Sequence, residues 1–446
     1  MSFPSISKFH KPIISLVCII LVGITFASQA ASNDLKPKNL SLSQPEKSMI
    51  DWIAARQAPM LEELSTHVNI NTGTANIKGL DFYRGLLKQE LLDLGFAIEQ
   101  HSSPSIPVLD CDGGQHVIAD HLLATRKGKS KNRILLNGHM DTVFSNDDEF
   151  QTLVIDADGR LKGPGVGDMK GGIVVMLNAL RALKAANLLE PATMIILLNS
   201  DEEIGSIGSR PLIEKIAKQH DIGIVFEGSF QNRFARARKG LGQARLKITG
   251  RESHAGGNHE DGVSASLELA HKIIEIENLT DYQRKTTVNV GVMQGGEKRN
   301  TVPGCADAYI DMRFPTQADG EQLKQNILGI AAKTSTSNPR YPDLPSIESW
   351  AILHRPAKAQ NAVVDDVISE AMGLSKLIGE PIIGSDYSGG GTDGSLAQAV
   401  GLATIDNMGL DGVGFHSSRE ESSVQSLMAR TKLAAVMLAR QIAKHD

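Results

Sequence analysis

The sequence predicts an α/β protein whose main domain has a mixed, mainly parallel sheet covered by helices, with a smaller α+β sandwich inserted into it. Apolar runs of strand length alternate with helical stretches along the first half of the chain, at residues 134–136, 169–186, 194–198, 207–218 and 222–226. Such alternation is typical of a parallel sheet with helices on both faces. From about Phe234 the order changes to strand–helix–strand–strand–helix–strand, which indicates an open-faced sandwich.

The chain of 446 residues is long enough for about two or three folding units. We expect the main domain at residues 45–235 and 350–446, and the inserted domain at 236–349. An amphipathic helix is expected to begin near Pro45 and to continue to about Leu64, and a second to end at Gly95. A long helix is expected at the carboxyl end, over 423–444. Inside the insertion, the expected strands and helices lie at 244–249, 263–276, 288–292, 306–312 and 322–331.

The composition excludes several classes of protein. Hydrophobic residues make up 41% of the chain and charged residues 22%, which rules out a disordered chain, a coiled coil or a multi-span membrane protein. The net charge of −5 gives no electrostatic case for nucleic-acid binding. Three cysteines are too few for a disulfide framework, and we expect Cys111 and Cys305 to be free thiols.

The first thirty residues have the pattern of a secretory signal. Lys8 and Lys11 precede an apolar run over 13–26, and the small residues of 27–30 form a cleavage site. An uncleaved membrane anchor is the alternative. We expect a cleaved signal at residues 1–30, no stable membrane association afterwards, and export, most simply to a bacterial periplasm.

Potential metal ligands follow the apolar strand runs or begin helices at five places. These residues are His139 with Asp141, Asp168, the acidic run containing Glu202 and Glu203, Glu227, and His416. Each has an ordinary alternative: a surface His–Asp pair, a helix N-cap at Asp168, or a solvated acidic loop. The glycines before Asp168 lack the spacing and terminal residues of a nucleotide-binding loop.

Taken together, these side chains are stronger evidence for a metal site than any one of them alone. Ligands of an open α/β sheet gather at the carboxyl ends of its strands, where these residues fall. Two histidines and three carboxylates suit two divalent cations such as zinc, with a shared carboxylate between them. Two such cations lower the pKa of a water molecule and polarise a carbonyl group. One further carboxylate then remains to transfer the proton.

On these motifs the chain resembles the co-catalytic zinc metallopeptidases, a family that includes glutamate carboxypeptidase, acetylornithine deacetylase, succinyl-diaminopimelate desuccinylase and aminoacylase. The resemblance covers about residues 45–446, with every motif in order. The signal, the Gly389–Asp393 run and His354-Arg355-Pro356 make it most similar to the secreted glutamate carboxypeptidase branch. One departure is the Gly228-Ser229 pair after Glu227, where relatives often carry proline.

The resemblance implies roles for the strand-end residues. It implies two Zn²⁺ per subunit, which Co²⁺ or Mn²⁺ can replace, held by His139, Asp168, Glu203, Glu227 and His416. Asp168 bridges the ions and precedes a cis peptide bond, and Asp141 lies behind His139. Glu202 is the general base, which takes a proton from water and passes it to the leaving nitrogen during amide hydrolysis.

The resemblance also implies contributions from outside the metal ligands. His254 matches a histidine that in relatives reaches the active site of the other subunit, so a homodimer is expected. Candidate substrate contacts are Asn300, Arg313, Arg355, Gly391 and Thr392, with the arginines suited to a carboxylate. Without the resemblance, a surface histidine is the preferred interpretation of His254, whereas each arginine fits a solvated surface charge as well as a substrate contact.

Three functions remain open at this point. The first is a secreted dinuclear zinc exopeptidase that removes a C-terminal residue, glutamate being the best candidate, from peptides or N-acyl amino acids. The second is an N-acyl-amino-acid deacylase of the acetylornithine deacetylase or aminoacylase type. The third is an inactive binding protein of the same fold, which the presence of Glu202 and all five ligands argues against.

Overall fold

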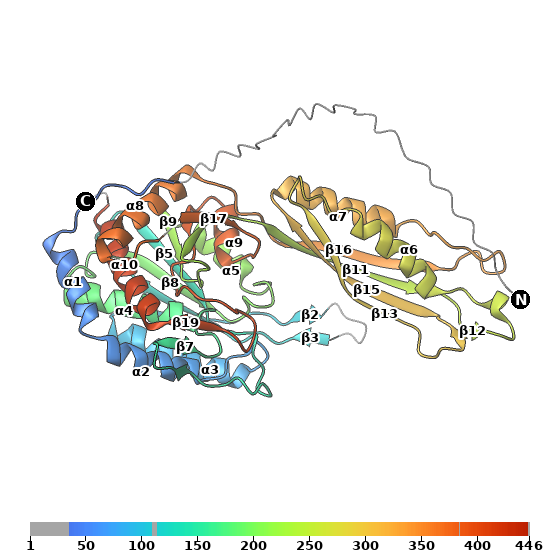
Figure 1. Ribbon diagram of the computed structural model, residues 1–446, viewed down its shortest axis with the longest axis horizontal. Helices are drawn as coiled ribbons and strands as arrows, with labels where there is room; N and C mark the ends of the chain where they lie inside the picture. Colours follow the sequence, from blue (N-terminus) through green and yellow to red (C-terminus); the bar gives the residue numbers. More distant parts are fainter. Residues whose placement is uncertain (1–34, 109–113, 383, 445–446) are drawn as a thin grey trace, which may run out of the picture. The chain divides into compact units, whose positions relative to one another are not determined.

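The computed structural model describes residues 35–108, 114–382 and 384–444 (Figure 1). The predicted signal at residues 1–30 and the predicted free thiol of Cys111 lie outside these ranges, whereas Cys305 is a free, exposed cysteine. Across the described ranges, every helix is too short or too polar to cross a lipid bilayer.

The largest sheet has six strands in the order β1-β4-β8-β5-β9-β18. Their bounds are Ala97–His101, His121–Arg126, Thr193–Asn199, Arg133–His139, Ile222–Val225 and Thr404–Ile405. Strands β8, β5, β9 and β18 pair in parallel, while β1 and β4 are added antiparallel at one side. The sheet is therefore mixed with a parallel centre, which confirms the predicted fold class.

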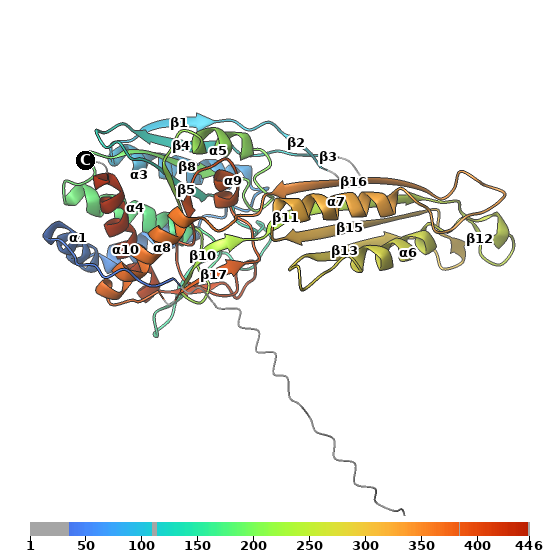
Figure 2. The ribbon, with the colours of Figure 1, turned by 90° about the horizontal axis from the view of Figure 1, so that it is seen from above.

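Helices cover both faces of this sheet because successive strand residues point to opposite sides. Leu136 and Ile196 belong to the larger core, which also contains residues of α1 (Gln44–Ala54), α2 (Gln57–Val68), α3 (Ile77–Asp93), α4 (Lys170–Ala185), α8 (Ala362–Ile378) and α10 (Val424–Ala443). Leu135 and Leu197 pack on the other face against α5 (Arg210–Ala217) and α9 (Asp393–Ala399). Figures 1 and 2 show the two layers of helices with the sheet between them.

The expected first helix is wrong in one respect, because the chain forms two helices, α1 and α2, separated at Ala55 and Arg56. Pro59 explains the break. Proline has no N–H to donate to the carbonyl of Ala55, and its ring would clash with that carbonyl in a continuous helix. In the observed arrangement Pro59 lies in the first turn of α2, where helices tolerate proline.

A second sheet has the antiparallel order β13-β15-β11-β16. These strands are Thr287–Gly295, Cys305–Phe314, Gly240–Thr249 and Ser346–Arg355, and helices α6 (Ala265–Glu277) and α7 (Gln317–Ala331) contribute to the cores beside them. The elements follow the predicted order along the chain, and β16 continues past residue 349 to Arg355. We propose that this sheet and its two helices are the inserted domain.

The remaining strands form small sheets around the two larger ones. They are β2 (Ile106–Val108) with β3 (Gly114–His116), β10 (Arg233–Arg238) with β17 (Gly384–Ser388), β12 (Ser253–His254) with β14 (Thr301–Val302), and β19 (Glu421–Ser423) with β7 (Arg160–Lys162) and β6 (Val154–Ile155). A short 3₁₀ helix spans His259–Asp261. The pairing of β19 with β7 connects the loop containing His416 to the segment that leads to Asp168.

Candidate active site

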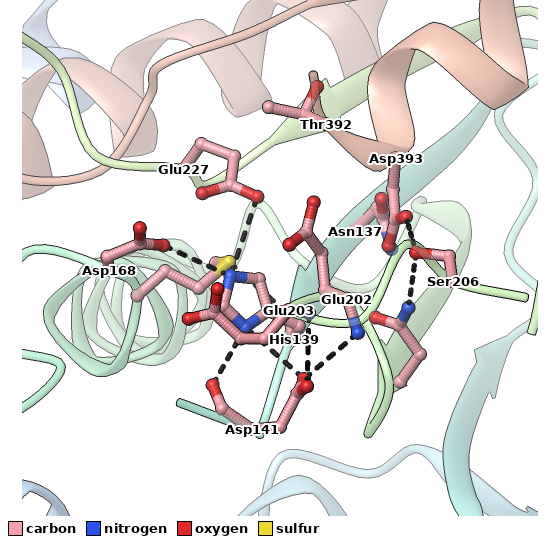
Figure 3. Close-up of polar contacts among 12 residues, drawn as sticks. Asn137, His139, Asp141, Asp168, Glu202, Glu203, Ser206, Glu227, Thr392 and Asp393 are labelled. Atoms are coloured by element: carbon pink, nitrogen blue, oxygen red, sulfur yellow. Dashed lines mark hydrogen bonds and ion pairs between the residues drawn. The ribbon is translucent and has the colours of Figure 1, made fainter. Parts of the chain in front are cut away.

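The parallel strands β5, β8 and β9 end on the same side of the main sheet, and their ends carry the candidate ligands. His139 is the last residue of β5, Glu202 and Glu203 follow β8, and Glu227 follows β9 (Figure 3). The parallel register of β5 with its two neighbours brings these three strand ends together. This is the edge of the sheet at which open α/β proteins bind their ligands.

His139 is buried between three carboxylates. Its Nε2 atom lies 3.2 Å from Asp168 Oδ1 and 3.5 Å from Glu227 Oε1. On the other side of the ring, Nδ1 lies 2.9 Å from the carbonyl oxygen of Asp141. Burial lowers the pKa of His139, but the neighbouring carboxylates, Glu227 first, outweigh it and raise the pKa well above its usual value.

Asp168 lies between two groups of side chains. Its Oδ1 atom faces His139, while its Oδ2 atom lies 3.1 Å from Nε2 of His416. The same nitrogen of His416 lies 3.3 Å from Glu203 Oε2. One oxygen of Asp168 therefore faces His139 and Glu227, and the other faces His416 and Glu203. The peptide bond between Asp168 and Met169 is cis, as the resemblance implied.

The approach of α4 to strand β9 depends on Gly172. A Cβ atom on this residue would lie 1.9 Å from the carbonyl oxygen of Phe226, so only glycine permits the observed contact. Because Asp168 lies two residues before the start of α4 and Glu227 follows Phe226, this contact keeps the two carboxylates near each other.

The donor set fits divalent cations. Two groups of three potential ligands lie within 4.8 Å of one another, namely His139 with Glu202 and Glu227, and His139 with Asp168 and Glu203. Burial raises the pKa of Glu203 and of Glu227 to about 7 in the absence of a cation, and the negative charge of Asp168 contributes to both shifts. The Oε1 atom of Glu203 is buried and has no hydrogen-bond partner among the described residues. Imidazole and carboxylate groups are ligands that zinc prefers.

Asp141 lies behind His139 and holds the acidic loop. Its two carboxylate oxygens accept hydrogen bonds from the backbone N–H groups of Glu202, at 3.2 Å, and Glu203, at 3.1 Å. The hydroxyl of Thr74 donates a further bond at 2.9 Å. Asp141 thus fixes the two adjacent glutamates relative to His139. Carboxylates that do not bind the metal themselves often orient metal ligands in this way.

Arg355 is buried and contacts the candidate base directly. Its Nη2 atom lies 2.7 Å from Glu202 Oε1 and donates to the hydroxyl of Ser206 at 3.0 Å, while Nη1 lies 3.1 Å from Asp393 Oδ1. Burial raises the pKa of Glu202 well above its usual value, and the positive charge of Arg355 opposes that shift. In this structure the guanidinium positions Glu202, and the predicted contact of Arg355 with the substrate stays a prediction.

Glu420 is a functional residue that the sequence reasoning missed. It is fully buried, and its carboxylate accepts hydrogen bonds from the backbone N–H groups of Gly165, Gly167 and Asp168 at 3.1, 2.8 and 3.0 Å. These bonds fix the glycine-rich loop that carries Asp168. Its proximity to His416 along the chain was the only available signal, because carboxylates of this supporting kind have no spacing rule.

The other predicted residues lie in separate places. His254 is exposed in β12, and its Nδ1 atom accepts hydrogen bonds from the N–H groups of Gly256 and Gly257. Asn300 is adjacent, since its carbonyl accepts a bond from Ala255. Across the described residues, no hydrogen bond or ion pair joins His254 or Asn300 to the five candidate ligands.

The Gly389–Thr392 loop contacts two of the predicted arginines, Arg313 and Arg355. Arg313 pairs with Asp311 at 2.7 Å and donates to the carbonyl of Gly389 at 3.5 Å. Gly391 packs on Arg355, where an added Cβ would lie 2.6 Å from the Cδ atom. The buried hydroxyl of Thr392 donates to Asp406 at 2.7 Å, so its hydrogen bond is made inside the protein.

The strand-end histidines and carboxylates, with a glutamate beside them, define a metal-dependent hydrolase. Comparison with known proteins identifies its family, since residues 135–440 match the model of peptidase family M20/M25/M40. The chain belongs to this family, which confirms the resemblance read from the sequence, and it is a zinc-dependent peptidase or amidohydrolase.

Two curated relatives and one solved structure illustrate the similarity. Carboxypeptidase G2 from Pseudomonas sp. (strain RS-16) is 28% identical over 409 residues, which cover 89% of this chain and 93% of the relative. Acetylornithine deacetylase from Proteus mirabilis (strain HI4320) is 28% identical, with coverage of 71% and 78%. The crystal structure of a tripeptidase from Staphylococcus aureus superposes with a TM-score of 0.70 at 20% identity, covering 87% of this chain and 99% of that one.

Proposed function

We propose that this protein is a secreted exopeptidase that holds two zinc ions and hydrolyses the amide bond before a C-terminal residue, glutamate being the preferred one. The observation that carries the proposal is the division of Asp168 between two groups of ligands, one oxygen facing His139 and the other His416. A carboxylate shared in this way suits two cations, each completed by one glutamate, Glu227 or Glu203.

The cations, when bound, lower the pKa of water and polarise the scissile carbonyl. The protein supplies the proton transfer through Glu202, whose carboxylate lies beside this group and whose backbone is held by Asp141. Arg355 holds one oxygen of Glu202 and leaves the other free to accept and return a proton. Burial of Glu202 raises its pKa, which makes the carboxylate a stronger base than a solvated one.

Export and a C-terminal preference rest on further observations. The pattern of residues 1–30 supports export, and the long match to carboxypeptidase G2 supports carboxypeptidase activity. Asn300, which lies beside His254, and Arg313 are proposed contacts of substrate carboxylates, with Gly391 as a backbone donor. Small peptides and N-acyl amino acids are the proposed substrates.

We also propose a homodimer in which His254 completes the partner's active site. The exposure of His254, and the absence of a contact with its own candidate ligands among the described residues, support a role in trans. Strand β13 lies at the edge of its sheet and exposes Val292 and Met293, so it offers backbone and apolar surface to a second copy.

The test is a hydrolysis screen of the zinc-loaded mature protein against N-acyl-glutamates, short peptides and N-acetyl amino acids. Glu202→Ala should retain the wild-type zinc content and lose turnover by about 10²–10⁴-fold, the usual contribution of a general base. Glu348→Ala is the matched control, because Glu348 is 72% exposed on β16. Near-normal hydrolysis by Glu202→Ala, or a zinc content far from two per chain, would refute the assignment.

Deacylation of N-acyl amino acids is a second candidate, because the relative from Proteus mirabilis is an acetylornithine deacetylase of equal identity. The two functions differ in which side of the amide carries the recognised carboxylate. A screen that holds the amino acid constant and varies the acyl group separates them. Acetyl substrates should be the best for a deacylase, whereas the C-terminal residue should dominate for a carboxypeptidase.

A further inference from the structure

A β-bulge in β16 lies next to the candidate base. Leu241 of β11 pairs with Arg355, but the following residue, Gly242, pairs with Leu353, so His354 is the additional residue of β16. Bulges often lie beside active sites, where they redirect a side chain that a regular strand would place elsewhere. The bulge therefore inserts His354 directly before Arg355, which binds Glu202.

The ring of His354 is largely buried but incompletely paired. It packs over Gly205, where an added Cβ would lie 3.1 Å from the ring atom Cδ2, and Gly205 ends the turn that contains Glu202. Its Nδ1 atom is buried and has no hydrogen-bond partner among the residues that the structure describes. Buried polar atoms are almost always paired, so this nitrogen is available to a polar group that enters the site.

Positive charges lie near this ring, and Nη1 of Arg210 donates to the backbone carbonyl of His354 at 3.3 Å. Burial, together with the charges of Arg355, Arg313 and Arg210, lowers the pKa of His354 to about 4. Arg313 and Arg210 each have an acidic partner, Asp311 and Glu214, and neither of those acids contacts His354.

Lys239 adds a further charge at the same end of the sheet. It directly precedes β11 and lies two residues before Leu241, which pairs with Arg313 on one side and with Arg355 on the other. Its backbone N–H donates to Ser388. Burial, together with the charges of Arg313 and Lys285, lowers the pKa of Lys239. Within the described part of the chain, the side chain of Lys239 forms no hydrogen bond or ion pair. The guanidinium of Arg313 donates to Gly389, the residue after Ser388, so both residues contact the same segment of the chain.

We propose that Lys239, Arg313 and His354 form a subsite for the side-chain carboxylate of an acidic amino acid on the leaving side of the scissile amide. The proposal rests on the proposed function and names the groups that would select glutamate. Arg313 and Lys239 supply positive charge, and the unpaired Nδ1 of His354 supplies an N–H donor. A neutral residue of the same shape would leave these groups unpaired, which is how polar sites discriminate strongly.

The experiment compares two substrates with one acyl group and either C-terminal glutamate or C-terminal glutamine. We expect the wild-type kcat/KM to favour glutamate by at least about 100-fold, and His354→Leu and Lys239→Met each to lower that ratio about tenfold. The ratio is unaffected by loss of folded enzyme, because both substrates report on the same active fraction. Lys247→Met is the matched control, since Lys247 is 44% exposed on β11 and should leave the ratio unchanged.

A binding measurement makes the result independent of turnover. Calorimetric titration of the zinc-loaded protein with free glutamate and free glutamine should show at least tenfold tighter binding of glutamate, and this preference should be lost in His354→Leu. Equal affinities in the wild type, or an unchanged preference in both variants, would overturn the subsite. Absence of hydrolysis with a clear preference for glutamate in binding would instead contradict the proposed function and leave the subsite supported.

Discussion

Removal of the Glu420 carboxylate tests how the Asp168 loop is held. Glu420→Ala leaves three buried backbone N–H groups, those of Gly165, Gly167 and Asp168, without their acceptors. Each such loss costs about 1–3 kcal/mol, so the free energy of unfolding should fall by at least about 3 kcal/mol. Glu420→Gln retains one acceptor oxygen but turns an amide N–H₂ group toward a backbone donor, so its loss should be smaller, at about 1–3 kcal/mol.

The assay is urea unfolding of the metal-free protein, followed by far-UV circular dichroism, with zinc affinity measured on the same variants. Because Asp168 depends on this loop for its position, both variants should also bind zinc more weakly. Glu421→Ala is the control, since the neighbouring residue is partly exposed and does not contact the loop's N–H groups. An unfolding free energy for Glu420→Ala within about 0.5 kcal/mol of wild type, the range of ordinary surface substitutions, would show that the reasoning is wrong.

Two further predictions concern other parts of the molecule. His254→Ala should lower turnover with zinc content unchanged, and mixing it with Glu202→Ala should restore partial activity if His254 acts in trans; no recovery after verified subunit exchange would contradict that role. Burial lowers the pKa of Lys358 to about 8 from 10.5, so the unfolded chain binds the proton of this ammonium more tightly than the folded chain does. The contribution of Lys358 to the free energy of unfolding therefore rises with pH between those two values. Lys358→Met should remove that rise in urea unfolding measured across the same pH range, and an unchanged slope would refute the assignment.

Strand ends were predictable from the sequence because they depend on local pattern. The apolar runs before His139, Glu202 and Glu227 identify buried parallel strands, and parallel strands place their carboxyl ends at one edge. The end of α3 was predictable for a similar reason, since Gly95 has a φ of +85° that favours glycine. In contrast, the break between α1 and α2 followed from a single residue, Pro59, inside an otherwise continuous apolar pattern.

Contacts between distant segments could not be predicted in the same way. Arg355 lies 153 positions from Glu202, yet its guanidinium is buried against that carboxylate. Glu420 lies 252 positions from Asp168 and accepts a hydrogen bond from its backbone N–H. The motif around Arg355 and the proximity of Glu420 to His416 mark these residues along the chain, but neither signal identifies the partner, because the partner is determined by how helices and loops pack.

Local sequence therefore determined which chemical groups stand at the ends of the strands, and through the family motifs it determined the class of reaction. Only the tertiary structure decided which groups support them: Glu420 bound to the Asp168 loop, Arg355 against Glu202, and His354 in a bulge beside Arg355. The physical reason is that backbone periodicity acts over a few residues, whereas burying a charge requires partners that only the folded chain can bring together.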